Sequence, residues 1–126
     1  MENLLIDSTK DTPKIDFNFE NGLLNFSGKS YPENTFNFYK PIIKWLQDYV
    51  ADNNNEKTTV KIDIEYLNSS SLKTYFEILD IFEVAHNRGK NVEIYWIYDE
   101  DNDIAQEIGE DFLEDFKSLS ITLVQK

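Results

Sequence analysis

Residues 59–98 read TVKIDIEYLNSSSLKTYFEILDIFEVAHNRGKNVEIYWIY, and the hydrophobic pattern of this stretch changes period twice. From Thr59 to Leu67 apolar and polar residues alternate, which is typical of a half-buried β-strand. From Leu72 apolar residues recur at helical spacing as far as Arg88-Gly89, where glycine can adopt the left-handed conformation that ends many helices. Val92 to Tyr98 is apolar and aromatic again, which indicates a second strand. The stretch therefore predicts a right-handed βαβ unit with two parallel strands.

The segment before this unit predicts an antiparallel hairpin. Apolar and polar residues alternate from Ile15 to Phe19, and Leu23 to Ser27 reads as the returning strand. Asn21-Gly22 between them is typical of a two-residue turn, because both residues tolerate positive φ. Residues 1–12 contain only a short apolar piece, and we interpret them as an arm docked on the domain.

Helical spacing also appears between the hairpin and the central strand. It predicts a helix over about residues 35–51. Pro41 lies inside this pattern, removes one backbone donor and should kink or split the helix. The asparagine-rich stretch 52–57 then predicts an exposed loop.

A third helix is predicted over about residues 102–116, with Ile104 and Leu113 among its inward-facing side chains. The acidic run 99–103 precedes it, and acids are favourable at the positive end of a helix. The run lacks the glycine and the final glutamate of a calcium-binding loop, so we interpret it as the start of the helix. Residues 119–124 predict the last strand.

The predicted elements follow the order ββαβαβαβ. One face of the central strand is apolar and the other is charged: Val60, Ile62, Ile64 and Tyr66 face one way, and Lys61, Asp63 and Glu65 the other. A charged second face predicts helices on one side of the sheet only. We therefore expect residues 1–126 to form a single α/β domain with a mixed five-stranded sheet covered by helices on one face.

The net charge of the chain narrows the classes of partner that it can bind. The chain has 126 residues, a net charge of −12, and Arg88 as its only arginine. Such a chain repels duplex nucleic acid and anionic membranes, and attracts a partner with a basic surface. No apolar run approaches the roughly 20 residues that span a bilayer, and the apolar part of the N-terminus is too short for a signal peptide. We expect a cytoplasmic protein that binds neither nucleic acid nor membranes.

The sequence offers few residues for catalysis. It has no cysteine, and its single histidine, His86, lies near the end of the second predicted helix, where it is favourable as a cation. Carboxylates are plentiful, but they fall on helix faces where solubility explains them. We therefore predict no enzymatic activity, no metal site and no cofactor. A hydrolase that uses carboxylates is a further hypothesis.

The run Asn68-Ser69-Ser70-Ser71 stands where the central strand is followed by the second helix. The first N–H groups of a helix lack partners within it, and a hydroxyl that caps them contributes about 0.5–2 kcal/mol. The same geometry suits a phosphate, which carries about −1.5 to −2 charges and would meet the positive end of the helix. The run therefore indicates either capping residues or a phosphorylation site.

The stretch from Gly28 to Asn34 reads GKSYPEN and is predicted as a loop. Its Gly-Lys-Ser is similar to the end of a phosphate-binding loop, but the upstream glycine is missing at the required spacing. Pro32 and Asn34 also stand where a helix should already be running. A plain loop is the favoured interpretation, and a small-molecule or nucleotide binding module that uses Gly28–Asn34 is our alternative hypothesis for function.

Several stretches together carry a resemblance to a known family. They are Ser30-Tyr31-Pro32-Glu33-Asn34, Tyr66-Leu67-Asn68-Ser69-Ser70-Ser71-Leu72-Lys73, Leu79-Asp80 followed by Ala85-His86, and Tyr95-Trp96-Ile97-Tyr98-Asp99. In these stretches the chain resembles the SiaC family of bacterial regulatory phosphoproteins, and the resemblance covers nearly its whole length. It implies a fold similar to anti-sigma-factor antagonists, the STAS type, with a sheet covered by helices on one side.

The resemblance also implies a mechanism. Members of the family are partner-switching proteins: a cognate kinase of the histidine-kinase-like ATPase type phosphorylates a hydroxyl residue after a Leu-Asn pair, and a PP2C-type phosphatase removes the phosphate. In the SiaC system the unphosphorylated form binds and activates a diguanylate cyclase, and relatives can serve other effectors. The matching position here is Ser69, with Ser70 and Ser71 as alternatives. The family residue is threonine, so this chain keeps the hydroxyl and loses the methyl group.

We therefore expect a non-enzymatic switch protein that binds an effector, such as a diguanylate cyclase, when Ser69 is unphosphorylated. The expected partner-binding residues lie at the turn and on the exposed start of the second helix: Asn68, Ser69, Ser70, Lys73 and Glu77. Phosphorylation of this surface is expected to weaken the effector complex by repulsion at the interface.

Overall fold

The predicted βαβ unit lies at the centre of the sheet in the computed structural model, which describes residues 1–52 and 54–126. Strands β4 (Thr58–Leu67) and β5 (Val92–Tyr98) pair in parallel, and helix α2 (Ser69–Asn87) connects them. The end of α2 follows the sequence prediction, because Gly89 has a φ of +102° and the N–H of Lys90 donates to the carbonyl of Ala85 at 3.1 Å.

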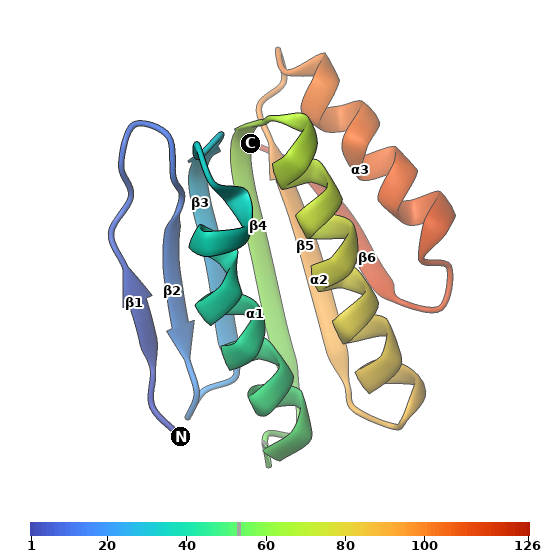
Figure 1. The fold of residues 1–126 in the computed structure, drawn as a ribbon. Helices are drawn as coiled ribbons and strands as arrows, with labels where there is room; N and C mark the ends of the chain where they lie inside the picture. The colour runs from blue at the N-terminus through green and yellow to red at the C-terminus, as the bar shows by residue number, and fades with distance from the viewer. Residues whose placement is uncertain (53) are drawn as a thin grey trace.

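The remaining elements flank this unit. They are β1 (Leu4–Ile6), β2 (Lys14–Asn18), β3 (Leu23–Ser30), α1 (Thr35–Asp52), α3 (Asp103–Asp115) and β6 (Ser120–Gln125). The strands lie in one sheet in the order β1-β2-β3-β4-β5-β6, antiparallel up to β3 and parallel from β3 to β6. All three helices cover the same face of this sheet (Figure 1). The mixed sheet with helices on one face is therefore confirmed.

The prediction of five strands is wrong, because the N-terminal arm forms β1 and pairs antiparallel with β2. The order of elements is thus βββαβαβαβ. Side chains also hold the arm: Asn3 Oδ1 accepts from the N–H of Phe19 at 2.8 Å, and Trp45 Nε1 donates to the carbonyl of Glu2 at 2.7 Å. The arm satisfies backbone groups of β2 that would otherwise form an open sheet edge.

The hairpin between β2 and β3 is present, but its turn is longer than the predicted two residues. Strand β2 ends at Asn18 and β3 begins at Leu23, so residues 19–22 form the turn. Only Gly22 in this turn has positive φ, at +65°. The side chain of Asn18 accepts from the N–H of Asn21 at 2.9 Å and stabilises the longer turn.

Helix α1 runs over its full length without a break at Pro41. The proline removes the donor for the carbonyl of Asn37, and both residues are exposed, so water can satisfy that carbonyl. Of the two outcomes predicted for Pro41, a split helix is wrong, and a kink stays a prediction. The loop expected over residues 52–57 includes Asn53, which lies outside the described residues.

Helix α3 packs on the sheet with a narrower stripe of buried residues than its sequence predicts. Ala105, Gly109 and Phe112 are its buried residues. Ile104 is 70% exposed and Leu113 is 41% exposed, so the prediction that both face inward is wrong. The helix approaches the sheet most closely at Gly109, where any side chain would contact Trp96.

The helix-free face of the sheet carries the predicted charged residues of β4. Lys61 and Glu65 are exposed and Asp63 is half-buried, so no second helical layer covers them. The opposite face contributes most of the core, in which the largest fully buried side chains include Trp96, Tyr39, Tyr49, Tyr75, Phe17, Phe26, Phe82 and Phe112. The domain thus has one packed face and one open face.

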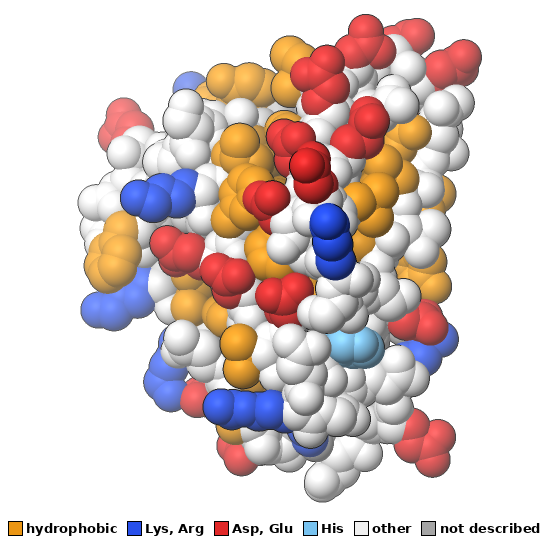
Figure 2. Space-filling view, turned by 90° about the vertical axis from the view of Figure 1, so that its right-hand side faces the viewer, with side chains coloured by type: hydrophobic (Ala, Val, Ile, Leu, Met, Phe, Trp, Pro, Cys, Tyr) orange, Lys and Arg blue, Asp and Glu red, His pale blue; other side chains and the backbone are white. Residues whose placement is uncertain are grey.

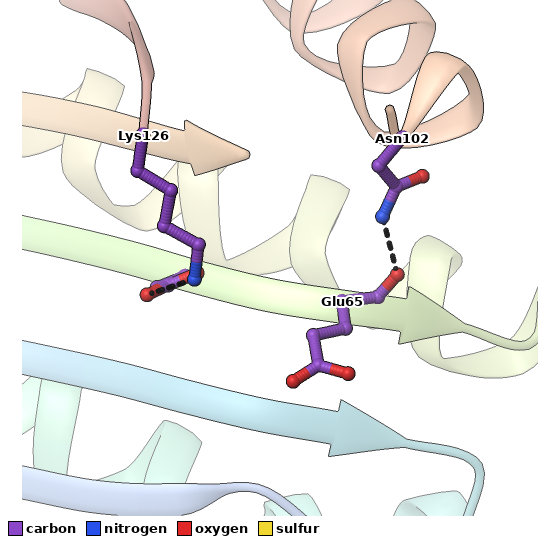
Figure 3. A network of polar contacts seen from close by, with 4 residues as sticks. Glu65, Asn102 and Lys126 are labelled. Atoms are coloured by element: carbon purple, nitrogen blue, oxygen red, sulfur yellow. Dashed lines mark hydrogen bonds and ion pairs between the residues drawn. The ribbon is translucent and has the colours of Figure 1, made fainter. Parts of the chain in front are cut away.

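A register shift near the end of β4 changes which residues face the core. Gly28 pairs with Ile64 and Lys29 with Tyr66, so Glu65 is an extra residue. Tyr66 is consequently 52% exposed, and the prediction that it faces inward is wrong. The side chain of Asn102, which also caps α3, donates to the carbonyl of Glu65 at 2.9 Å (Figure 3). The bulge is therefore tied to the start of α3.

Candidate functional site

The junction of β4 and α2 is capped by an asparagine. Asn68 has an extended backbone, and its Oδ1 accepts from the N–H of Ser71 at 2.9 Å. This is the usual geometry of a helix N-cap. The hydroxyls of the serine run therefore do not cap the helix as the sequence suggested, because the amide of Asn68 already occupies that position.

Ser69 is the first residue of α2, and its side chain is exposed. Among the residues that the structure describes, no group forms a hydrogen bond with the hydroxyl of Ser69. The hydroxyl stands one residue beyond the cap, at the positive end of an α-helix of 19 residues. The position is thus open to a modifying enzyme and favourable for an added negative charge.

The two following serines lie in different surroundings. Ser70 is exposed, and its hydroxyl lies 2.6 Å from that of Thr35 at the start of α1. Ser71 is fully buried, and its hydroxyl lies 2.7 Å from that of Ser30 at the end of β3. Burial of Ser71 and the contact of Ser70 leave Ser69 as the most accessible hydroxyl of the three.

A buried chain of hydroxyls extends from Ser71 into the core. The hydroxyl of Ser30 also lies 2.7 Å from that of Tyr39, which donates to the hydroxyl of Tyr75 at 3.0 Å. Burial raises the pKa of Tyr39 to about 12, and burial raises the pKa of Tyr75 well above its usual value. Both tyrosines are therefore neutral at physiological pH and join β3, α1 and α2 beneath the serine run.

Lys73 and Glu77 lie on the first turns of α2, and both are exposed. Together with Ser70 they line a hollow of about 670 Å³ between α1 and α2. Thr35 and Phe36 of α1 line the same hollow, and Phe36 is 71% exposed. The structure thus brings the predicted residues of α2 together with a face of α1 that the sequence analysis missed. The available signal was topology, because both helices follow parallel strands and begin at the same edge of the sheet.

The Gly28–Asn34 stretch, predicted as a loop, is a loop only over residues 31–34. Its first residues belong to β3, which extends to Ser30, and the hydroxyl of Ser30 points into the buried chain. Asn34 caps α1, because its Oδ1 accepts from the N–H of Asn37 at 3.0 Å. The pattern GKSYPEN is therefore explained by a strand end and a helix cap.

The part of the chain that the structure describes contains neither a candidate metal-binding cluster nor a candidate membrane-spanning helix. No group of three or more histidine, cysteine, aspartate or glutamate side chains there is arranged to hold a metal ion. Among the same residues, no helix has the length and apolar character needed to cross a membrane.

Known proteins match the chain closely in sequence and structure. The model of the SiaC family of regulatory phosphoproteins matches residues 6–126. An uncharacterised protein, PA14_02130 of Pseudomonas aeruginosa strain UCBPP-PA14, is 37% identical over 117 residues, which cover 91% of this chain and 90% of that protein.

Solved structures agree with the sequence comparison. SiaC of Pseudomonas aeruginosa is 33% identical over the full length of both chains, with a TM-score of 0.91. The complex of the diguanylate cyclase SiaD with its activator SiaC, from the same species, contains a chain that is 34% identical, with a TM-score of 0.91 and coverage of 98% and 99%. From the serine run, the fold and these matches, we conclude that the chain belongs to the SiaC family of regulatory phosphoproteins.

Proposed function

We propose that this chain is a cytoplasmic, non-enzymatic partner-switching regulator, and that phosphorylation of Ser69 controls it. The unphosphorylated form binds and regulates an effector, of which a diguanylate cyclase is the leading candidate. A cognate serine/threonine kinase of the histidine-kinase-like ATPase type adds the phosphate, and a PP2C-type phosphatase removes it. The fold and mechanism are those of STAS-like regulators. Membership of the SiaC family and the solved complex of SiaC with SiaD support this proposal.

One observation carries the assignment of Ser69. Ser69 is exposed at the N-terminus of α2 and precedes Ser70, which lines the hollow between α1 and α2 together with Lys73 and Glu77. A phosphate there would add about −1.5 to −2 charges at the positive end of the helix, which the fold tolerates without rearrangement. A partner bound over the same residues would meet that charge directly.

The surroundings of Ser69 favour repulsion of the partner over an internal conformational change. Arg88, the only arginine of the chain, lies at the opposite end of α2. No bidentate clamp can therefore hold a phosphate at Ser69. Lys73 stands one turn further along the helix, at the i,i+4 spacing that favours a single pairing with phosphoserine. Such a pairing removes Lys73 from contact with the partner.

The proposal is tested by mapping the modified residue and the bound partner together. The chain and its Ser69→Ala variant are incubated with the candidate kinase and ATP, and the phosphorylated peptide is identified by mass spectrometry. We expect modification of Ser69 in the parent chain and none at residues 69–71 in the variant. A pull-down from the native host with Ser69→Ala as bait should recover the effector. Phosphate found only outside residues 69–71 would contradict the proposal.

The alternative of a nucleotide-binding module at Gly28–Asn34 has little support. Ser30 is fully buried and hydrogen-bonded to Tyr39 and Ser71, and Asn34 is engaged as a helix cap. The hydroxyl and amide that would contact a phosphate are thus already in use. A hydrolase that uses carboxylates to hold a metal ion gains no support either, since no group of three or more histidine, cysteine, aspartate or glutamate side chains among the described residues could hold one.

A further inference from the structure

Helices α1 and α2 leave two neighbouring hollows along the line where they meet. The first has a volume of about 670 Å³ and the second about 390 Å³, and Gln47 of α1 lines both parts of this surface. We refer to the two parts together as the α1–α2 trough, which is lined by Thr35, Phe36, Tyr39, Lys40, Ile43, Lys44, Gln47, Val50, Ala51, Ser70, Lys73, Thr74, Glu77, Asp80, Ile81, Val84, Ala85, Arg88 and Lys90. From Thr35 to Ala51 the trough follows α1 for about 24 Å.

The charge of the trough is opposite to that of the chain. Five of the 12 basic residues line it, but only two of the 24 acidic residues, Glu77 and Asp80, do so. Asp48 lies close by and forms an ion pair with Lys44 at 2.7 Å. Figure 2 views the molecule from the α3 side, and both basic and acidic side chains lie along its left edge, which is the helix-covered side of the sheet. A trough with net positive charge on a chain of −12 favours an acidic ligand.

Exposed apolar side chains accompany these cations. Phe36 is 71% exposed at one end of the trough, and Val84 is 50% exposed at the other. Ile43 lies between them and is half-buried. The ammonium group of Lys40 lies 5.8 Å from the centre of the Phe36 ring, so the apolar and cationic groups are interleaved. This combination suits a ligand that is apolar along one stripe and acidic beside it.

We infer that the α1–α2 trough binds an acidic amphipathic helix of a partner protein. An apolar stripe that recurs at i, i+3 or i+4 and i+7 along the whole length of that helix contacts Phe36, Ile43 and Val84, and its flanking glutamates and aspartates face the lysines. A helix fits better than a compact ligand because the trough is elongated, and its length corresponds to about 16 residues of α-helix. The inference rests on the proposed function, since Ser70 lines the trough and places phosphoserine 69 beside its end.

The test uses three synthetic 16-residue helical peptides that share one apolar stripe and carry glutamate, glutamine or lysine at the flanking positions. Binding of the unphosphorylated chain is measured by fluorescence anisotropy. We expect the glutamate peptide to bind about tenfold or more tightly than the lysine peptide in about 50 mM salt, with the difference reduced in about 500 mM salt. Equal affinities of the glutamate and lysine peptides, or no measurable binding of either, would overturn the inference.

Charge reversal in the chain locates the binding site. The double variant Lys40→Glu, Lys44→Glu should weaken binding of the glutamate peptide about tenfold or more, and Phe36→Ala should weaken it further. All three side chains are exposed, so the fold should persist, as circular dichroism can verify. Lys10→Glu with Lys117→Glu is the matched control, because it makes the same change of charge at exposed residues outside the trough. Equal losses in both double variants would overturn the inference.

Two further results separate this inference from the proposed function. If the glutamate peptide binds in the trough but phosphorylation of Ser69 does not change effector affinity, the trough is supported and the switch fails. If phosphorylation weakens effector binding but Lys40→Glu, Lys44→Glu does not, the switch is supported and the trough fails. Concentration-dependent self-association abolished by the same double variant would assign the trough to a second copy of the chain, and would also overturn the inference.

Discussion

Helix α3 and the helix pair α1–α2 cover the same face of the sheet, but they differ in how closely they pack and in charge. At Gly109 a Cβ atom would lie 2.6 Å from Cδ1 of Trp96, so only glycine lets α3 lie directly on β5. Trp96 Nε1 also donates to the carbonyl of Ala105 at 2.8 Å. The pair α1–α2 instead leaves a cation-lined trough beside Ser69. The comparison indicates that α3 mainly stabilises the domain, whereas α1 and α2 form the proposed binding surface.

The largest stability change expected at neutral pH is the loss on changing Gly109 to alanine. Alanine is the better helix former by about 1 kcal/mol, but its Cβ would collide with the buried ring of Trp96. We expect the free energy of unfolding to fall by about 1–3 kcal/mol, measured by urea denaturation. Glu110→Ala, at an exposed position of the same helix, is the control and should change stability by less than about 0.5 kcal/mol. Stabilisation by Gly109→Ala would show that α3 does not pack tightly on β5.

The second prediction concerns the buried tyrosines beneath the proposed binding surface. The pKa of Tyr39 is raised to about 12 and that of Tyr75 is also raised, in both cases mainly by burial. The unfolded chain releases these protons near pH 10, whereas the folded chain retains them, so their contribution to stability is complete below about pH 10 and is lost as pH rises through the folded pKa. For Tyr39 alone the loss is of order 2–3 kcal/mol.

Denaturation curves measured between about pH 9 and pH 12 test the predicted contribution of these two tyrosines to the pH dependence of stability. Stability should fall with pH in the parent chain, and the slope should be smaller in the Tyr39→Phe, Tyr75→Phe double variant. The double variant also loses hydrogen bonds, which lowers its stability at every pH, so the slope and not the absolute value is the relevant quantity. Equal slopes in the two proteins would contradict the burial of this hydroxyl pair.

A smaller effect distinguishes the capping residue from the proposed phosphorylated residue. Asn68→Ala removes the side chain that accepts from the N–H of Ser71, and we expect it to lower the free energy of unfolding by about 1 kcal/mol. Ser69→Ala removes an exposed hydroxyl and should change it by less than about 0.5 kcal/mol. Thermal unfolding of both variants measures the difference. A larger loss for Ser69→Ala than for Asn68→Ala would show that Ser69 has a structural role instead.

Local pattern was enough to predict the centre of the fold. The change from alternation to helical spacing after Leu67 located the junction at which Ser69 lies exposed. Gly89 ended α2 as predicted, because the closing conformation depends on a residue that tolerates positive φ. These features depend on neighbours in sequence, which is why the sequence alone contains them.

Features that depend on distant contacts were missed. Strand β1 forms because β2 has an edge with which it can pair. Tyr66 faces outward because of the bulge in β4 opposite Gly28 and Lys29. Ile104 is exposed because Gly109 fixes how α3 sits on Trp96. The α1 side of the trough was also missed, since Phe36 appears in the sequence as one more apolar residue of a helical stripe. In each case the partner lies far along the chain.

Effector affinity with and without phosphate on Ser69 tests the central claim most directly. The chain is prepared unmodified, stoichiometrically phosphorylated at Ser69, and as Ser69→Ala, and each form is titrated with the effector recovered by pull-down. We predict equal affinity for the unmodified and alanine forms, and affinity lower by about tenfold or more for the phosphorylated form, which corresponds to about 1.4 kcal/mol. Equal affinity of the phosphorylated and unmodified forms would contradict the account.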